Sequence, residues 1–299
     1  MPENSISSDK EDGGMNGNIP VLCVSGNSLA AAWENSLLEL FSRGVRIQTE
    51  YDKPEDAFSL DSTMLITVEN PLSEPRIHRA FPGGLEFLEE YRQEVVEGIK
   101  DQWIRDPNNP EDKRWEYTYH ERLFSYRVPG IERPFDQIGA IVDKLSEKPF
   151  SRRAQAVTWK VWEDQRIYDP ACLQSIWCRI LPGDDNAWVL NMNVRFRSND
   201  AYEAAFMNMF ALTSLQEKMA NHISTRASRA VKLGRYVHLA DSYHIYGTRI
   251  NDFKERFLSQ IEKRSFEERT WTMEIAEPIF EEAKTQIAEK VKRQTEKYR

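Results

Sequence analysis

Cysteine is scarce in this chain, which has only three among its 299 residues: Cys23, Cys172 and Cys178. The number is odd and the spacing matches no set of metal ligands, so we expect neither a disulfide framework nor a metal site. A single reactive thiol is still compatible with this pattern.

Long apolar runs and a basic surface are also missing. No apolar stretch approaches the ~20 residues that span a bilayer, and the polar N-terminus lacks the build of a signal peptide. The formal net charge of -8 argues against binding to the phosphates of nucleic acids. We therefore expect a cytoplasmic protein that binds neither membranes nor nucleic acids. A small anionic ligand would need only a local arginine cluster.

Hydrophobic residues make up 40% of the chain, which is enough for a substantial core. Residues 1–18 are polar and rich in Gly, Ser and Asn, so we expect a disordered tail there. Residues 19–299 are expected to form a single domain.

Periodic apolar residues predict the elements of an α+β fold. Helices are expected at 30–43, 84–103 and 135–145, from about Ala201 with Asn199 or Asp200 as its cap, and from about Thr272. Strands are expected at 63–68, 156–162, 175–181, 188–196 and 236–239. A hairpin-type turn at 182–186 joins two of these strands, so the sheet should be mostly antiparallel.

Cys172 lies in the segment YDPACLQS, between Pro170 and a predicted strand. A lone cysteine is more often a small buried hydrophobe than a nucleophile, so the spacing by itself favours a structural role. A reactive thiol would need a neighbour that lowers its pKa. Arg152, Arg153 and Arg197 are the nearest candidates in the sequence.

The arginines have two interpretations each. Arg152 and Arg153 form either a solvated basic pair or part of an anion site. Arg197 and Ser198 stand where a strand gives way to a helix, which suits phosphate binding. Ser198 and Asp200 could instead cap that helix, and both roles can hold at once.

Taken in order, these residues resemble the thymidylate synthase family over more than half of the chain. An Arg-Arg pair is followed after six residues by Trp159 and after about twenty by the Pro-x-Cys of Cys172. The motifs that follow are Arg197-Ser198-Asn199-Asp200, then Asn208 eleven residues beyond Arg197, and His244-Ile245-Tyr246. The segments YTYHERL, PACLQS, RSNDA and ADSYHIYG resemble the archaeal and nucleotide-hydroxymethylase branches more than the common bacterial and eukaryotic synthases.

The resemblance implies a twisted sheet covered by helices, with the back of the sheet forming a homodimer interface. It also implies that Cys172 adds to C6 of a pyrimidine nucleoside monophosphate, so that C5 captures the one-carbon unit of 5,10-methylenetetrahydrofolate. Tyr119 aligns with the family tyrosine near the C5 proton. A glutamate of the 84–103 helix should organise the proton-relay water, and Glu90 is our choice.

The substrate-binding residues implied by the resemblance are Arg152, Arg153, Arg197, Ser198, Asp200, Asn208, His244 and Tyr246. The three arginines would hold the 5′-phosphate, and Arg152 and Arg153 would reach it across the dimer interface. Asn208 would read the base edge, and His244 and Tyr246 would hold the sugar. Without the resemblance, the last three are ordinary structural polar residues.

Some features depart from the family pattern. Leu173 replaces the histidine that follows many family nucleophiles, and Arg46 is the nearest candidate for the N-terminal phosphate arginine. The chain ends in TEKYR without the apolar tail that closes over the folate, which favours hydroxymethylation over reductive methylation. Asn208 favours uracil, hence dUMP. The alternatives are a CMP or dCMP 5-hydroxymethylase and an inactive nucleotide-binding paralogue.

Overall fold

The computed structural model describes residues 17–106, 109 and 111–298. The disorder predicted for the tail therefore lies, for residues 1–16, outside the described residues. Within the described ranges, no helix is both long enough and apolar enough to cross a membrane.

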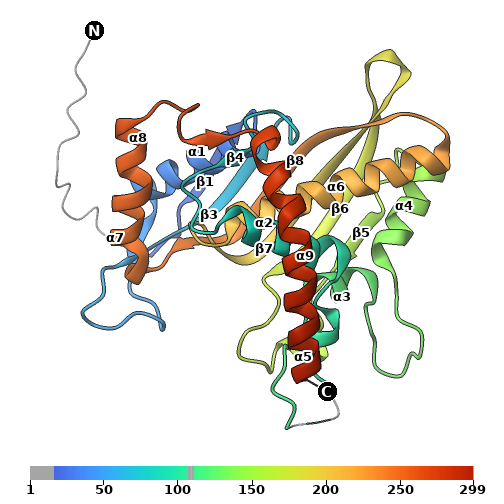
Figure 1. The fold of residues 1–299 in the computed structure, drawn as a ribbon, viewed down its shortest axis with the longest axis horizontal. Coiled ribbons are helices and arrows are strands. Elements are labelled where there is room, and N and C mark those ends of the chain that lie inside the picture. Colours follow the sequence, from blue (N-terminus) through green and yellow to red (C-terminus); the bar gives the residue numbers. More distant parts are fainter. Residues whose placement is uncertain (1–16, 107–108, 110, 299) are drawn as a thin grey trace.

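A seven-stranded sheet forms the centre of the fold (Figure 1). Its strands run in the order β1 (Val21–Gly26), β3 (Ser59–Val68), β8 (Val231–Ile245), β7 (Trp188–Asp200), β6 (Leu173–Pro182) and β5 (Ala154–Val157), and β2 (Val45–Ile47) pairs with β3. The β1–β3 and β7–β8 pairs are parallel and the others are antiparallel. The predicted α+β class with a mostly antiparallel sheet is confirmed.

The helices are layered on one face of this sheet (Figure 1). The inner helices are α1 (Leu29–Arg43), α4 (Gln137–Glu147) and α6 (Ala205–Ala227). Next, α2 (Leu85–Glu97) packs over α6, and α9 (Met273–Lys297) packs over α2. Helix α6 links the parallel strands β7 and β8, because parallel neighbours need a long crossover.

We call the opposite face of the sheet the back face. Along each strand, residues of the back face alternate with residues that face the core. Core-facing residues such as Ile66, Val194 and His238 are buried, whereas their strand neighbours are half-buried or exposed. The back face includes Leu65, Trp177, Asn193, Val237 and Leu239. This mixed surface has the alternation expected of a sheet with one face on the core.

The remaining elements are short. They are β4 (Ile77–His78), β9 (Thr270–Trp271), α3 (Tyr119–Phe124), α5 (Val161–Asp164), α7 (Ile250–Asp252), α8 (Ser259–Lys263), 3-10 turns at Asp101–Trp103, Asp184–Asn186 and Gly247–Arg249, and a π-helical turn at Phe253–Leu258.

Several predicted boundaries were wrong for local reasons. Helix α2 ends early because Gly98 adopts a left-handed φ of 68° that closes the helix. The strand expected at 156–162 stops at Val157, and the chain then turns into α5. There the Asp164 carboxylate accepts from the Lys160 amide and pairs with buried Arg122.

Two further differences concern β7 and β8. The helix expected from Ala201 begins at Ala205, because β7 continues to Asp200, which pairs with His244 of β8. Neither Asn199 nor Asp200 is therefore its cap, which is Ala204. Strand β8 is fifteen residues long, far beyond the short strand expected at 236–239, and β1 was not predicted at all.

Candidate active site

A cleft of about 440 Å³ lies at the start of β6. It is lined by Glu94 of α2, by Asp169 and by residues 114–119. Tyr119 connects the cleft to the predicted nucleophile, because its hydroxyl oxygen accepts from the Leu173 amide at 3.3 Å. Leu173 directly follows Cys172, so the thiol stands beside this cleft.

Cys172 is half-buried, and its sulfur lies 3.9 Å from the carbonyl oxygen of Pro170. Burial raises the pKa of the thiol; the Arg197 charge opposes this increase and the Asp169 charge adds to it. Burial likewise raises the pKa of Tyr119, and a negative charge on Cys172 would raise it further. These surroundings therefore favour the thiol over the thiolate.

Arg197 is the arginine that the structure brings to Cys172. Its backbone amide donates to the Cys172 carbonyl at 2.8 Å, and its guanidinium donates to the carbonyls of Ala171 at 3.2 Å and Pro170 at 2.5 Å. The side chain is 34% exposed, so the guanidinium remains open to a ligand while it holds the loop in front of Cys172. Ser198 follows it and pairs with Ser242 of β8.

Arg152 and Arg153 lie elsewhere. Both are exposed in the loop before β5, where the Trp177 indole donates to the Arg152 carbonyl and Ala154 pairs with Cys178. Cys178 is six residues along β6 from Cys172, which corresponds to about 20 Å at a rise of ~3.3 Å per residue. Within one chain these two arginines do not join the site of Cys172.

Asn208 projects from the first turn of α6 and is buried. The Tyr91 hydroxyl donates to its Oδ1 at 2.5 Å. Within the described ranges, its Nδ2 donates to no protein group. The carbonyl side of the amide is therefore fixed, and the two N–H donors remain for a ligand.

His244 and Tyr246 stand together at the end of β8, with ring centroids 4.7 Å apart. The His244 Nδ1 lies 3.3 Å from Ser242 Oγ, and its buried Nε2 has no hydrogen-bond partner among the described residues. Burial lowers the pKa of His244, although the negative charge of Asp61 acts to raise it. Burial raises the pKa of Tyr246 to about 12. A buried nitrogen without a partner is unusual and indicates a place for a ligand group.

Asp200 closes the turn that precedes α6. Its Oδ1 accepts from the amides of Tyr202 at 2.9 Å and Glu203 at 2.8 Å, and burial raises the pKa of its carboxyl. The residue therefore shapes the loop between Ser198 and Asn208.

Glu90 and Glu94 occupy different surroundings although they are one turn apart on α2. Glu90 is held by ion pairs with Lys100 at 2.8 Å and with Lys290 of α9 at 2.7 Å. Glu94 lines the cleft with Tyr119, and burial raises the pKa of its carboxyl despite the nearby Lys100. Of these two α2 glutamates, Glu94 is the one that lines the cleft, and the sequence analysis did not choose it.

Tyr91 and Tyr117 were also missed. Tyr91 lies three residues before Glu94, so both lie on one face of α2. This spacing could have indicated the pair from the sequence. Tyr117 lines the cleft beside Tyr119. Across the described ranges, no group of three or more His, Cys, Asp or Glu side chains could hold a metal ion.

Comparisons with known proteins point to one family. The family model described as "Thymidylate synthase" matches residues 86–293. The "Putative thymidylate synthase" of Methanocaldococcus jannaschii is 30% identical over 80% of this chain and 97% of its own length. That of Methanosarcina acetivorans is 27% identical over 75% of this chain and 88% of its own.

Structural similarity extends to the bacterial branch. The thermostable thymidylate synthase A of Bacillus subtilis superposes with a TM-score of 0.57 at 19% identity, covering 80% of this chain and 86% of its own. The fold is therefore shared. The family match over most of the chain goes further: this chain belongs to the thymidylate synthase family, whose enzymes use a folate to transfer a one-carbon group to C5 of a pyrimidine nucleotide.

Proposed function

We propose that this chain transfers the one-carbon unit of 5,10-methylenetetrahydrofolate to C5 of dUMP through a covalent adduct of Cys172. The proposal rests on the position of Cys172 beside the cleft. Arg197 donates hydrogen bonds to the loop of Cys172 through both its backbone amide and its guanidinium. A thiol placed next to a cation and an open cleft suits nucleophilic catalysis.

The chemistry begins with addition of the Cys172 thiolate to C6, which makes C5 nucleophilic. Because burial raises the pKa of the thiol, we propose that its proton passes to water as the bound nucleotide brings the sulfur and C6 together. Arg197 and Ser198 bind the 5′-phosphate, and Asp200 holds the turn that follows them. The partnerless Nε2 of His244, together with Tyr246, binds the sugar.

Proton transfer at C5 falls to Tyr119 and to a glutamate-bound water. We assign the glutamate to Glu94 in place of Glu90, because Glu94 lines the cleft and Glu90 is paired with two lysines. Burial raises the pKa of this carboxyl, which favours its role in holding and releasing a proton.

The preference for uracil rests on the fixed amide of Asn208. With Oδ1 bonded to Tyr91, Nδ2 is the group that faces a ligand, and it can donate to the O4 of uracil. Cytosine carries an amine at the same position, and two donors cannot bond to each other.

The folate fits the cleft by the chemistry of its lining. Trp115 and Tyr117 offer flat aromatic faces for a pterin ring, and Asp169 offers a carboxylate for its N–H groups. When bound, the folate supplies the methylene carbon. We propose hydroxymethylation, in which water completes the reaction. The Trp103 indole donates to Thr295 in the last turn of α9 at 3.1 Å, and a turn held in this way is not free to close over the folate and exclude water.

The active unit is proposed to be a homodimer packed through the back face. The exposed loop of Arg152 and Arg153 borders this face at Trp177. Arginines about 20 Å from their own Cys172 can serve a phosphate only if they reach the site of a second copy.

The test is tritium release from C5-labelled dUMP, dCMP, UMP and CMP in the presence of methylenetetrahydrofolate. We expect release from dUMP, none with Cys172→Ser, and a product whose mass shows an added hydroxymethyl group. Release from a cytosine nucleotide alone would support the CMP or dCMP hydroxymethylase instead. Calorimetric binding of dUMP without release from any nucleotide would support the inactive paralogue and contradict the proposal.

A further inference from the structure

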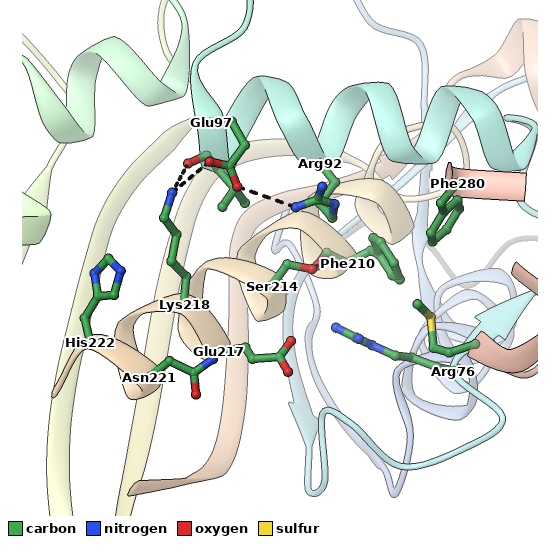
Figure 2. Close-up of a pocket in the computed structure, with 12 residues that line it drawn as sticks. Arg76, Arg92, Glu97, Phe210, Ser214, Glu217, Lys218, Asn221, His222 and Phe280 are labelled. Carbon is green, nitrogen blue, oxygen red and sulfur yellow. Dashed lines mark hydrogen bonds and ion pairs between the residues drawn. The ribbon is translucent and has the colours of Figure 1, made fainter. Parts of the chain in front are cut away.

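A second pocket, of about 410 Å³, lies away from Cys172 between α2, α6 and α9 (Figure 2). Helix α6 contributes Phe210, Ser214, Glu217, Lys218 and Asn221. These positions recur at three- and four-residue steps and so share one face of α6, whereas Asn208 projects from the opposite face toward the catalytic site. The two pockets are therefore separate.

Arg76 is the central charge of this pocket. It is only 5% exposed, its guanidinium stacks 4.8 Å from the Phe210 ring centroid, and it donates to Thr213 Oγ1 at 3.2 Å. Among the described residues, its Nε has no hydrogen-bond partner and the guanidinium forms no ion pair. A buried guanidinium stays charged, and the charges of Glu217 and Glu74 act on it only from beyond ion-pair distance, which leaves a place for an anion.

The other cations of the pocket already have partners. Arg92 donates two bonds to Glu89, each 2.7 Å long. Lys218 donates to the Glu97 carboxylate and to the Val96 carbonyl, both at 2.9 Å. Of these three cations, Arg76 is therefore the one that can pair with a ligand anion.

Glu217 supplies the complementary charge. It is half-buried and forms no ion pair with any described residue, although its charge acts on both Arg76 and Arg92. Figure 2 shows the Glu217 carboxylate and the Arg76 guanidinium pointing toward each other across the pocket. The pocket thus contains a guanidinium and a carboxylate that form no ion pair with each other or with another described residue. The buried Phe280 ring also lines the pocket.

We propose that this pocket binds a small zwitterion of the α-amino-acid class with an apolar side chain. The ligand carboxylate pairs with Arg76, its ammonium group pairs with Glu217, and its apolar part packs on Phe280 and Met273. Each charge of the ligand meets an opposite charge that the protein leaves without a partner.

The test uses three probes of similar shape: L-leucine, isocaproate, which lacks the amine, and isoamylamine, which lacks the carboxylate. Binding to the full chain is followed by saturation-transfer NMR and calorimetry. We expect L-leucine to bind roughly tenfold more tightly than isocaproate, and isoamylamine to bind least.

Two variants assign the charges. Glu217→Gln, a change at a half-buried surface position, should lower the affinity for L-leucine to that for isocaproate and leave isocaproate unchanged. Arg76→Met should abolish binding of both, and Arg79→Gln, an exposed arginine outside the pocket, should change neither.

The proposal is overturned if wild-type protein binds none of the probes, if isocaproate binds as well as L-leucine, or if Glu217→Gln has no effect on L-leucine. Binding of inorganic phosphate in competition with and more tightly than L-leucine would also overturn it, because the site would then be a simple anion site. Since Glu217→Gln carries the assignment of the ammonium group, the proposal stays testable even if Arg76→Met fails to fold.

Discussion

The hydroxyl of Tyr91 on α2 donates to Oδ1 of Asn208 on α6 at 2.5 Å, across 117 positions of sequence. This bond fixes which end of the amide faces the catalytic site. If base selection depends on it, removing the hydroxyl should let the amide rotate and present its carbonyl to an amine.

Tyr91→Phe is therefore expected to lower the preference for dUMP over dCMP by about tenfold, the effect of one hydrogen bond. The ratio of tritium release from the two C5-labelled nucleotides measures it. Tyr243→Phe, which removes another buried and hydrogen-bonded hydroxyl, is the control and should leave the ratio unchanged. An unaltered ratio in Tyr91→Phe would separate base selection from this bond.

The thiol of Cys172 should titrate above its ordinary pKa of 9.0, because burial disfavours its charge. Its alkylation by iodoacetamide should therefore rise with pH. In a Cys23→Ser background, which removes the exposed cysteine, Arg197→Gln should move the profile to higher pH and Asp169→Asn to lower pH. Shifts of the same sign in both variants would contradict the assignment of these two charges.

Glu94 and Glu90 offer a matched pair on one helix. Glu94→Gln should reduce tritium release by about 100-fold, in the range of general acid–base catalysis. Glu90→Gln should lower turnover far less, and should instead reduce the denaturation midpoint by weakening the link to Lys290 of α9. Equal losses of turnover in the two variants would contradict the placement of the proton relay at Glu94.

Sharing of arginines between subunits predicts complementation. Cys172→Ser and the double variant Arg152→Ala/Arg153→Ala should each be inactive alone. After subunit exchange, their mixture should recover about a quarter of wild-type activity, because half of the dimers then contain one intact site. A mixture as inactive as its components, with heterodimers shown by native mass spectrometry, would refute the sharing.

A buried ion cluster should make stability depend on pH. Burial would raise the pKa of Glu34, but bonds from Arg269 and His78 outweigh it and lower the pKa to about 2. The folded pKa is depressed, so this stabilisation is present above the ordinary value of 4.5 and is lost as the pH falls toward 2.

Glu34→Gln should accordingly lower the free energy of unfolding by ~3 kcal/mol at neutral pH, and by progressively less in acid. Urea denaturation at several pH values measures this difference. Glu39→Gln on the same helix removes an exposed ion pair with Arg43 and should cost less than about 0.5 kcal/mol. A pH-independent difference for Glu34→Gln would show that its ionisation is not responsible.

The sequence was most informative where neighbours in the chain are neighbours in space. Cys172 directly precedes β6, and Arg197 lies near the end of β7, which pairs with β6, so Arg197, one of the three arginines proposed from the sequence, lies beside Cys172. The class of the sheet followed from the alternation of its longer strands.

Other features depended on contacts that local pattern does not encode. Nothing in the 84–103 helix separates Glu90 from Glu94 until α9 is placed, because the Lys290 that neutralises Glu90 is 200 positions away. The helix expected from Ala201 starts late because Asp200 still pairs with His244 across β8. Local capping propensity was thus overridden by strand pairing.

The docking of α9 has a dynamic consequence. Thr295 near its end accepts from the Trp103 indole, and the Trp103 ring packs edge-on, at 5.3 Å, against Trp115, which lines the catalytic cleft. We therefore expect fluctuations of the last helix to reach the wall of the cleft through these two indole rings. Tryptophan fluorescence should sense both fraying of the C-terminal helix and filling of the cleft, so that the protein carries its own optical reporter of ligand binding.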